Sequence, residues 1–588
     1  MKIKTLSSNN EITYKTVTDV WATTVEKPRQ LIVELANGTK LHCSNNHPVM
    51  VQGAVGVEQV DAEHLTAQHV IITDTGTTTV ASITADDTNT QYVDLSVEDT
   101  EVFFTADSID NNMILTHNCS QGGIRGGSAT GYYPWWHLEF PELIVLKNNS
   151  GTEESRERHI DYGVEINKFL FDRFVADENI TLFSPHEVPE LKDAFYRGTN
   201  TDFERVYAEL EQKPGIKKRV VSAKEMIYNI ASERQKTGRI YINFIDNMMQ
   251  QGPFERLLPT QYLMSNLCLE IALPVIPFNE INSDIGQIAL CTLSSSNWGK
   301  LSKPADLEKP CRSMVRALDN LLSYQEYPVK PAENFTKAFR ALGIGIVGFA
   351  HFLARRGLKY NIDAAEIVDE YMEAMAYYLT DESVRIAAEK GACEGFDQTC
   401  YARGIFPWEK RNKNIDRVVK HKLRYNWEEL RERLKKYGIR NATLMAVAPT
   451  ESSSILLGET NGIEPPIMDI VEKKSKDGIL KQLVPGYHNL KNKYDYKWEQ
   501  ADNKGYLILM AVIQKWTDQA ISSNTNYDPG KFPDSKIPLS LLVQDLMFSH
   551  QLGLKTLYYQ NMNDMNTDVE ASANQQTIVD EVCESCVI

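Results

Sequence analysis

The chain has 588 residues, 42% of them hydrophobic, with nine cysteines and a formal net charge of −17. This length is more than one hydrophobic core supports, so we expect two or more domains. The negative charge disfavours nonspecific binding to nucleic acid and to anionic membranes. The sequence contains no apolar run of about 18 residues, opens without a secretory signal pattern and lacks the cysteine pattern of a secreted disulfide framework. We therefore expect a cytoplasmic protein that binds no membrane and no nucleic acid.

Residues 1–118 are rich in Thr and Val and contain short alternating runs such as RQLIVEL. Such alternation is typical of half-buried β-strands, and Asn37-Gly38 is a hairpin-turn signal. From about residue 140 onward, longer helical patterns are mixed with short apolar strands. The sequence predicts a small all-β domain that ends at LTHNCS, followed by an α/β body.

The tripeptide His117-Asn118-Cys119 stands at this boundary. An asparagine side chain can cyclise onto its own carbonyl carbon and cut the chain, provided that a neighbour such as His117 polarises the carbonyl or assists the leaving amine. The Cys119 thiol can accept an acyl chain before the cut. The tripeptide by itself is weak evidence for this chemistry.

Flanking segments strengthen the interpretation. LHCSNNHPVMV, YVDLSVEDTEVFF and NNMILTHNC resemble conserved blocks of inteins. Residues 1–118 therefore resemble the larger part of an intein of the Hint fold. The splicing residues that this resemblance implies are Ser44 in the position usually held by Thr, His47 for the first acyl shift, Asp94, the penultimate His117, the cyclising Asn118 and the downstream nucleophile Cys119.

The first intein block, with its own nucleophilic Cys or Ser, has no counterpart in the sequence. We therefore expect the C-terminal part of a split mini-intein that splices in trans with an N-terminal partner. A truncated sequence or a decayed β domain is the alternative.

The segment SNLCLEIALP carries a thiol between an amide and a carboxyl group. If it is extended, Asn266, Cys268 and Glu270 share one face and point into one pocket. A second thiol, Cys291, follows in IALCTLS. The alternative is a buried cysteine beside a surface glutamate.

The segment APTESSS predicts a helix N-terminus near Thr450, whose hydroxyls and backbone N–H groups could hold a phosphate, although most such segments are only caps. Near the end, Tyr558 and Tyr559 are adjacent, and neighbouring strand residues usually place one ring inside and one outside. The acidic tail that follows ends in Cys583-x-x-Cys586. Two cysteines make only half of a zinc site, so a mobile redox dithiol is favoured.

The segment GIGIVG, residues 343–348, fits the dinucleotide-binding pattern G-x-G-x-x-G, with Asp363 at a suitable distance. The preceding NFTKAFRAL is helical in pattern, and no strand leads into the glycines. A nicotinamide dehydrogenase is therefore disfavoured.

Seven segments resemble, in order and spacing, the large (alpha) catalytic subunit of class I ribonucleotide reductase. They are CSQGGIRGGSAT, SNLCLEIALP, IALCTLS, PTESSS, NGIEPP, SNTNYDPGKFP and LYYQN. The resemblance implies a ten-stranded α/β barrel with a central finger loop, present in part over residues 119–565 and followed by a flexible redox-active tail over 566–588. The fold class expected for the chain is therefore α/β, preceded by the all-β Hint domain.

The resemblance also implies residue roles. Cys268 becomes the thiyl radical that abstracts the 3′ hydrogen of a ribonucleotide, Glu270 is the base for the 3′ hydroxyl, and Asn266 binds the substrate. Cys291 is one of the two thiols that are oxidised. The other implied roles are Tyr558 and Tyr559 as stacked radical relays from the small subunit, and Cys583 and Cys586 as the dithiol that re-reduces the disulfide. Thr450, Glu451, Ser452 and Ser453 are implied diphosphate contacts, and Gln121 and Arg125 are implied readers in the effector-sensing loop. Cys311, Cys393 and Cys400 match no redox position and are expected in the core or on the surface.

No cofactor or metal is expected on this chain. The resemblance implies a radical supplied by a metal-containing small (beta) subunit, nucleoside triphosphate effectors, ribonucleoside diphosphate substrates, thioredoxin or glutaredoxin as reductant, and a homodimer of the spliced subunit. Since the partner thiol of Cys291 lies upstream in the family, the chain alone is expected not to turn over nucleotides before it is joined to an N-terminal reductase fragment. A non-catalytic remnant that binds nucleotides or a partner subunit is the alternative.

Overall fold

The computed structural model describes residues 2–6, 12–24, 30–44, 47–53, 57–73, 76–85, 91–97, 102–105, 114–117, 128–152, 155–420, 422–475 and 478–563. The chain divides into two compact units, Met1–Gly127 and Ser128–Ile588.

The described residues of the first unit form β-strands and one short 3-10 turn, Ala62–His64. One sheet has the order β1-β2-β9, and the other has the order β10-β11-β5-β7-β8-β3-β4 with β6 paired to β5. Leu41, Val49 and Ile71 are buried in its core. This arrangement agrees with the predicted all-β domain. The strands are β1 (Lys2–Leu6), β2 (Ile12–Thr24), β3 (Gln30–Leu35), β4 (Lys40–Ser44), β5 (Pro48–Gln52), β6 (Val57–Asp61), β7 (Val70–Thr73), β8 (Gly76–Ala85), β9 (Gln91–Val97), β10 (Val102–Thr105) and β11 (Ile114–His117).

The predicted Asn37-Gly38 turn joins β3 to β4. Gly38 has a φ of 87°, in the left-handed region that glycine tolerates, and the side chain of Asn37 accepts a hydrogen bond from the backbone N–H of Thr39 at 3.1 Å. The turn signal is therefore confirmed.

The second unit is built around a curled sheet. β12 (Thr130–Pro134), β13 (Asp161–Ile166) and β16 (Ile240–Phe244) are parallel, and β24 (Thr556–Leu557) is antiparallel to β16. β13, β16 and β24 are buried along their whole length, whereas β12 is partly buried at residues 130–132 and buried at Tyr133 and Pro134. Burial on both faces is typical of parallel strands, although the buried polar residues Asp161, Glu165 and Asn243 interrupt the apolar runs.

A second set of strands continues the curl. β19 (Leu293–Asn297) is parallel to β20 (Gly343–Val347), and the N–H of Ile344 donates to the carbonyl of Leu444 at 2.8 Å. Val447 then forms a parallel bridge with Ile521, and the N–H of Tyr558 donates to the carbonyl of Ser523 at 2.8 Å. The order across this part of the curl is therefore β19, β20, residues 443–447, residues 519–523 and Tyr558, which directly follows β24.

β20 contains the GIGIV part of the dinucleotide-like segment and is fully buried. A Cβ atom at Gly345 would lie 2.7 Å from the carbonyl oxygen of Ala446. The glycines therefore allow close packing of two barrel segments. The segment that resembled a phosphate loop is itself a strand, which is why no strand precedes it.

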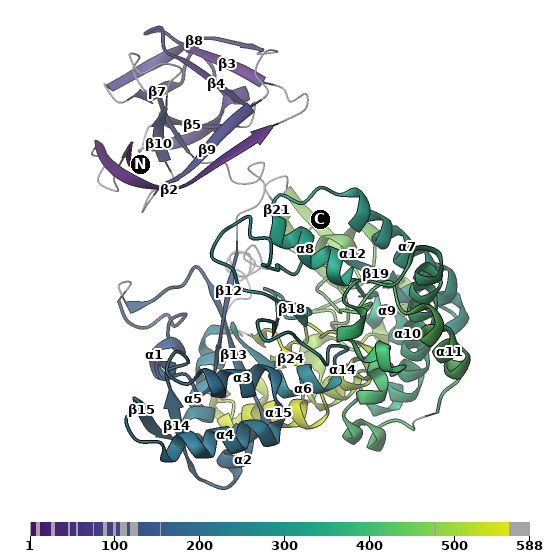
Figure 1. Ribbon diagram of the computed structural model, residues 1–588. Helices are drawn as coiled ribbons and strands as arrows, with labels where there is room; N and C mark the ends of the chain where they lie inside the picture. The colour runs from purple at the N-terminus through teal and green to yellow at the C-terminus, as the bar shows by residue number, and fades with distance from the viewer. Residues whose placement is uncertain are drawn as a thin grey trace. The chain divides into compact units, whose positions relative to one another are not determined.

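Helices cover this sheet from outside. In Figure 1, α1, α2, α4 and α5 lie on one side of the second unit, and α7, α10 and α11 lie on the other. No helix among the described residues is long and apolar enough to cross a membrane. The helices are α1 (Phe140–Leu143), α2 (Lys168–Val175), α3 (Pro189–Arg197), α4 (Asn200–Gln212), α5 (Ala223–Thr237), α6 (Ile245–Gln251), α7 (Glu308–Tyr324), α8 (Lys330–Phe339), α9 (Phe349–Arg356), α10 (Ala365–Lys390), α11 (Trp427–Tyr437), α12 (Glu451–Leu457), α13 (Tyr487–Leu490), α14 (Lys504–Trp516) and α15 (Leu539–Gln551).

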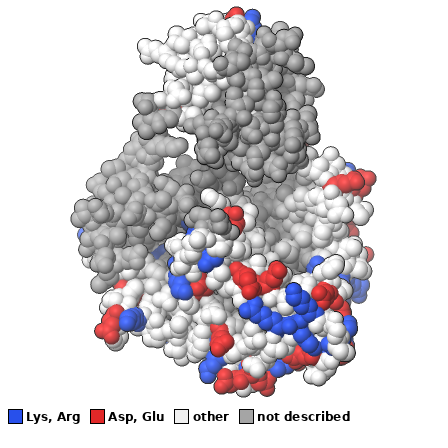
Figure 2. Space-filling view, turned by 90° about the vertical axis from the view of Figure 1, so that its left-hand side faces the viewer, with Lys and Arg blue, Asp and Glu red and all other residues white. Residues whose placement is uncertain are grey.

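Short two-stranded pairs complete the unit. They are β14 (Asn179–Phe183) with β15 (Lys218–Ser222), β17 (Tyr262–Met264) with β18 (Leu273–Val275), β21 (Ile470–Ser475) with β22 (Gly478–Leu483), and β23 (Thr525–Tyr527) with β25 (Gln560–Met562). On the face shown in Figure 2, the described Lys and Arg side chains lie interspersed with Asp and Glu side chains. Such mixing suits surface ion pairs, which individually contribute little to stability.

Candidate active site

The loop that carries Cys268 connects β17 to β18, which pair antiparallel with Met264 opposite Leu273. Residues 267–269 form a turn, and Leu269 has a φ of 65°. The prediction of an extended segment over Asn266–Glu270 is therefore wrong. The reason is the hairpin: the chain must reverse direction within eight residues, and it does so at the cysteine.

The turn nevertheless brings the predicted groups together. The side-chain Nδ2 of Asn266 donates to Oε1 of Glu270 at 2.7 Å and lies 3.6 Å from the sulfur of Cys291. Oδ1 of Asn266 accepts the backbone N–H of Ile271 at 3.2 Å, which fixes the orientation of the amide. Glu270 and Cys268 are both 0% exposed, so the alternative of a surface glutamate is wrong. An amide, a carboxyl group and a second thiol therefore meet at this loop.

The segment 519–522 is hydrogen-bonded to the loop that carries Cys268. The N–H of Ala520 donates to the carbonyl of Glu270 at 2.9 Å, and the N–H of Ala272 donates to Oε1 of Gln519 at 3.2 Å. The hydroxyl of Ser522 donates to the carbonyl oxygen of Cys268. Backbone and side-chain bonds on both sides of the cysteine therefore hold the loop in the barrel.

Tyr558 and Tyr559 lie against this loop. Tyr558 belongs to the same buried apolar cluster as Cys268, and Tyr559 packs on that cluster. The two ring centroids are 3.9 Å apart, and the hydroxyl of Tyr558 donates to that of Tyr559 at 2.9 Å. The expectation that adjacent rings face opposite sides is wrong, because β24 ends at Leu557 and β25 begins at Gln560, leaving the pair outside regular strand geometry.

Sequence reasoning missed Tyr241, which lies on β16. Its ring centroid is 4.8 Å from that of Tyr558 and 5.6 Å from that of Tyr559, and its hydroxyl donates to Oδ2 of Asp161 at 2.9 Å. No local sequence signal separates Tyr241 from other core tyrosines, because its ring partners Tyr558 and Tyr559 lie about three hundred residues further along the chain.

Burial raises the pKa of Tyr559 to about 12, so this phenol keeps its proton at neutral pH.

The predicted helix start at Thr450 is confirmed, since α12 begins at Glu451 with Thr450 as its N-cap. The hydroxyl of Thr450 donates to Oδ1 of Asn461 at 3.1 Å and accepts the N–H of Gly462 at 2.7 Å. Nδ2 of Asn461 donates to Oε1 of Glu451 at 2.6 Å. The NGIEPP segment thus braces the start of α12, where Ser452 and Ser453 are partly buried.

Several predicted site residues cannot be placed. Asn118, Cys119, Gln121, Arg125, Cys583 and Cys586 lie outside the described residues, and the side chains of Ser44, Asp94 and His117 are not described although their strands are. In the register of β11 with β5, Thr116 lies opposite Val49. The backbone at His117 is therefore near that of Pro48, which follows His47.

Cys311, Cys393 and Cys400 are buried, and burial raises the pKa of each thiol to about 12. Buried thiols with such pKa values are unreactive, in agreement with their expected place outside the redox chemistry. Among the described residues, no group of three or more His, Cys, Asp or Glu side chains could hold a metal ion.

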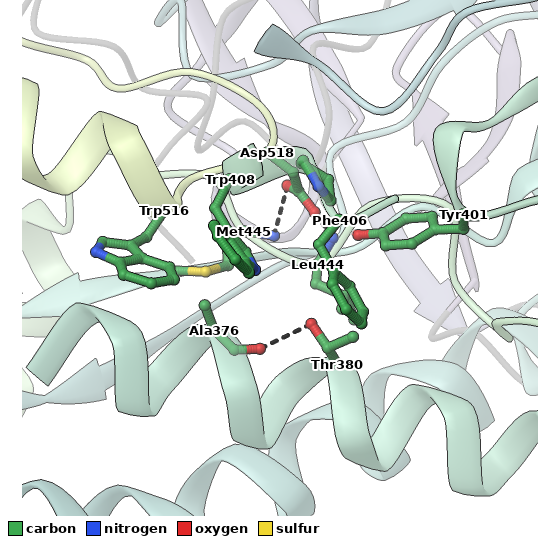
Figure 3. Close-up of a pocket in the computed structure, with 10 residues that line it drawn as sticks. Ala376, Thr380, Tyr401, Phe406, Trp408, Leu444, Met445, Trp516 and Asp518 are labelled. Carbon is green, nitrogen blue, oxygen red and sulfur yellow. Dashed lines mark hydrogen bonds between the residues drawn. The ribbon is translucent and has the colours of Figure 1, made fainter. Parts of the chain in front are cut away.

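A small cavity lies beside Asp518, the residue before the segment that supports the loop (Figure 3). Its volume is about 10 Å³, and its lining includes Tyr401, Phe406, Trp408 and Trp516. Oδ1 of Asp518 accepts the N–H of Met445 at 2.9 Å beside it. A space of this size holds at most one water molecule, so it is not a nucleotide site.

A curled α/β sheet, with a cysteine at the tip of a loop and two contacting tyrosines beside it, defines a barrel-type fold built around a buried thiol. The chain belongs to the ribonucleotide reductase family: residues 107–560 match the family's barrel domain. The family resemblance of the reductase part is thereby confirmed.

Curated relatives agree. The chain is 48% identical over 455 residues to ribonucleoside-diphosphate reductase subunit alpha of Haemophilus influenzae, covering 77% of this chain and 60% of that protein. It is 46% identical over 470 residues to ribonucleoside-diphosphate reductase 1 subunit alpha of Escherichia coli, covering 80% of this chain and 61% of that protein. It is 43% identical over 455 residues to ribonucleoside-diphosphate reductase subunit alpha of Enterobacteria phage T4, covering 76% of this chain and 59% of that protein. The chain thus spans about three fifths of the length of these relatives.

Proposed function

We propose that this chain supplies the barrel portion of the alpha subunit of a class I ribonucleoside-diphosphate reductase, the enzyme that makes deoxyribonucleotides for DNA synthesis. The observation that carries the proposal is the contact of the Asn266 amide with both Glu270 and Cys291 on the loop of Cys268. In the reaction, the Cys268 sulfur abstracts the 3′ hydrogen atom, and Glu270 takes the proton of the 3′ hydroxyl. The 2′ hydroxyl leaves as water, and two thiols, Cys291 and one from the upstream fragment, become a disulfide.

The remaining predicted residues serve this cycle. The small subunit, when bound, supplies the oxidising equivalent through its metal-centred radical chemistry, and Tyr559 and Tyr558 carry the radical to Cys268. Cys583 and Cys586 reduce the new disulfide by thiol exchange and are themselves reduced by thioredoxin or glutaredoxin. Thr450 to Ser453 hold the diphosphate at the start of α12, and Gln121 and Arg125 respond to the nucleoside triphosphate effector in a dimer of the complete subunit.

Deoxynucleotide formation tests this proposal. The complete subunit, combined with its small subunit and a dithiol reductant, is expected to reduce a ribonucleoside diphosphate, and Cys268→Ser is expected to abolish the reaction. Cys311→Ser alters another buried cysteine and is the matched control that should stay active. Equal activity of Cys268→Ser and the wild type would rule the mechanism out.

We further propose that residues 1–118 splice this chain to an N-terminal reductase fragment. The support is the sequence resemblance, the all-β unit and the register that brings the backbone at His117 near that of Pro48, the residue after His47. Mass spectrometry after mixing with the upstream fragment is expected to show a joined product that lacks residues 1–118. Asn118→Ala should block release of this segment, while Asn37→Ala, a change in the β3–β4 turn, should permit it. A chain that keeps its original mass with the correct partner contradicts splicing.

A further inference from the structure

Ser522 lies between two groups at the centre of the proposed reaction. Its hydroxyl donates to the carbonyl oxygen of Cys268, and the same Oγ lies 3.3 Å from Oε2 of Glu270. Ser522, Cys268 and Glu270 are all buried. The hydroxyl therefore contacts the backbone of the radical-forming residue and the side chain of the proposed base at once.

The position of this hydroxyl is set by the barrel. The N–H of Ser522 donates to the carbonyl of Val447 at 2.9 Å, and the N–H of Ala520 donates to the carbonyl of Glu270 at 2.9 Å. Nε2 of Gln519 donates to the carbonyl of Leu342 at 2.9 Å. Because the segment is held on both sides, rotation of the hydroxyl hydrogen about the Cβ–Oγ bond is the simplest motion left to it.

A serine hydroxyl has one proton to donate and two lone pairs that accept. When the Glu270 carboxyl is ionised, Oε2 can only accept, and the Ser522 proton turns toward it. When Glu270 holds a proton on Oε2, that proton is donated to Oγ, and the Ser522 proton turns to the Cys268 carbonyl. Ser522 keeps its own proton in both states, and no covalent bond to it forms or breaks.

We propose that Ser522 is a positioning residue that couples the protonation of Glu270 to the backbone of Cys268. The proposal rests on the proposed function, in which Glu270 takes the proton of the substrate 3′ hydroxyl. Before that transfer, Ser522 stabilises the carboxylate. After it, the rotated hydroxyl holds the Cys268 carbonyl while the radical is on the substrate and the Cys268 sulfur keeps the abstracted hydrogen atom.

The chain offers a matched control in the next residue. Ser523 is also buried, but its hydroxyl donates to the carbonyl of Thr556 at 3.0 Å, away from the carboxyl group. Ser522→Ala and Ser523→Ala therefore each remove one buried serine hydroxyl from the same segment. Only the first is expected to affect Glu270, and Ser522→Thr, which keeps the hydroxyl, should restore the wild-type behaviour.

Infrared spectroscopy of the full chain measures the ionisation of Glu270 without turnover, with Glu270→Gln used to assign its carboxylate band. In Ser522→Ala the pH midpoint of this band should rise by about one pH unit, because the charge-assisted hydrogen bond to the ionised carboxylate is stronger than the one made with the protonated form, and both are lost. With ¹³C at the cysteine carbonyls, the Cys268 amide band, assigned with Cys268→Ala, should shift at the same midpoint in the wild type but not in Ser522→Ala. Identical midpoints in Ser522→Ala and the wild type overturn the proposal.

A second variant and a second measurement complete the test. If Ser522→Ala does not fold, as judged by its circular dichroism, Ser522→Cys keeps the volume with a weaker donor and should raise the midpoint in the same direction. In the complete enzyme, the acid limb of the kcat profile should move with the infrared midpoint. A complete enzyme without activity contradicts the proposed function, whereas the infrared midpoints decide the role of Ser522 separately.

Discussion

Tyr558 and Tyr559 are consecutive in the chain, yet their ring centroids lie 3.9 Å apart and one hydroxyl donates to the other at 2.9 Å. Tyr558 is 2% exposed and belongs to the cluster that contains Cys268, whereas Tyr559 is only partly buried. The pair therefore runs from a more accessible position to the buried thiol.

Tyr559→Phe keeps the ring and removes the hydroxyl. If the phenol carries a proton-coupled radical, reductase activity should fall by at least about a hundredfold while the thermal midpoint stays near that of the wild type. Tyr228→Phe, on α5, makes the same chemical change where the ring packs against Phe174 and should remain active. An equal effect of both variants would contradict the relay.

Asn266→Ala should lower kcat by about a hundredfold, because it removes the donor that orients the buried Glu270 carboxyl and contacts the Cys291 sulfur. Steady-state rates of dithiol-dependent turnover measure the effect. Asn320→Ala, at an exposed position that pairs with Lys390, is the control and should behave as the wild type. A variant at position 266 with normal kcat would show that the contact has no role in catalysis.

Glu165, on β13, gives the barrel a pH-dependent stability. Burial raises its pKa from 4.5 to about 7, although hydrogen bonds from Tyr196 and Asn243 oppose the shift. Since the folded pKa is raised, the contribution of this group is complete below about pH 4.5 and is lost as the pH rises through 7. The free energy of unfolding in urea should therefore be lower at pH 8 than at pH 5. Glu165→Gln should reduce this difference by about 2 kcal/mol.

The exposed Glu209→Gln, on α4, should leave the pH dependence of unfolding unchanged. A Glu165→Gln chain that retains the wild-type difference between the two pH values would show that this carboxyl does not titrate with folding.

Gly345→Ala should destabilise the second unit by about 1–3 kcal/mol, because the new Cβ would lie 2.7 Å from the carbonyl oxygen of Ala446. Gly131→Ala, on β12, places its Cβ 3.7 Å from the ring of Tyr162, an ordinary contact, and should change stability little. Thermal unfolding of the two variants compares them. Equal midpoints would contradict the close packing of β20 against residues 443–447.

Local signals predicted the local features. The Asn37-Gly38 turn and the start of α12 follow from short-range chemistry, and both are observed. The extended form of the Cys268 loop was wrong, because the positive φ of Leu269 is imposed by the pairing of β17 with β18. The role proposed for Ser522 has no sequence signal, since Ser523 is chemically identical and differs only in what the barrel places beside it.

The central claim is that the Cys268 sulfur removes the 3′ hydrogen atom of the substrate. The most direct measurement compares kcat/KM for a ribonucleoside diphosphate carrying hydrogen or deuterium at the 3′ carbon, with the complete subunit and its small subunit. The account predicts a slower reaction with the deuterated substrate and no product from Cys268→Ser. Product formation by Cys268→Ser at the wild-type rate would contradict it.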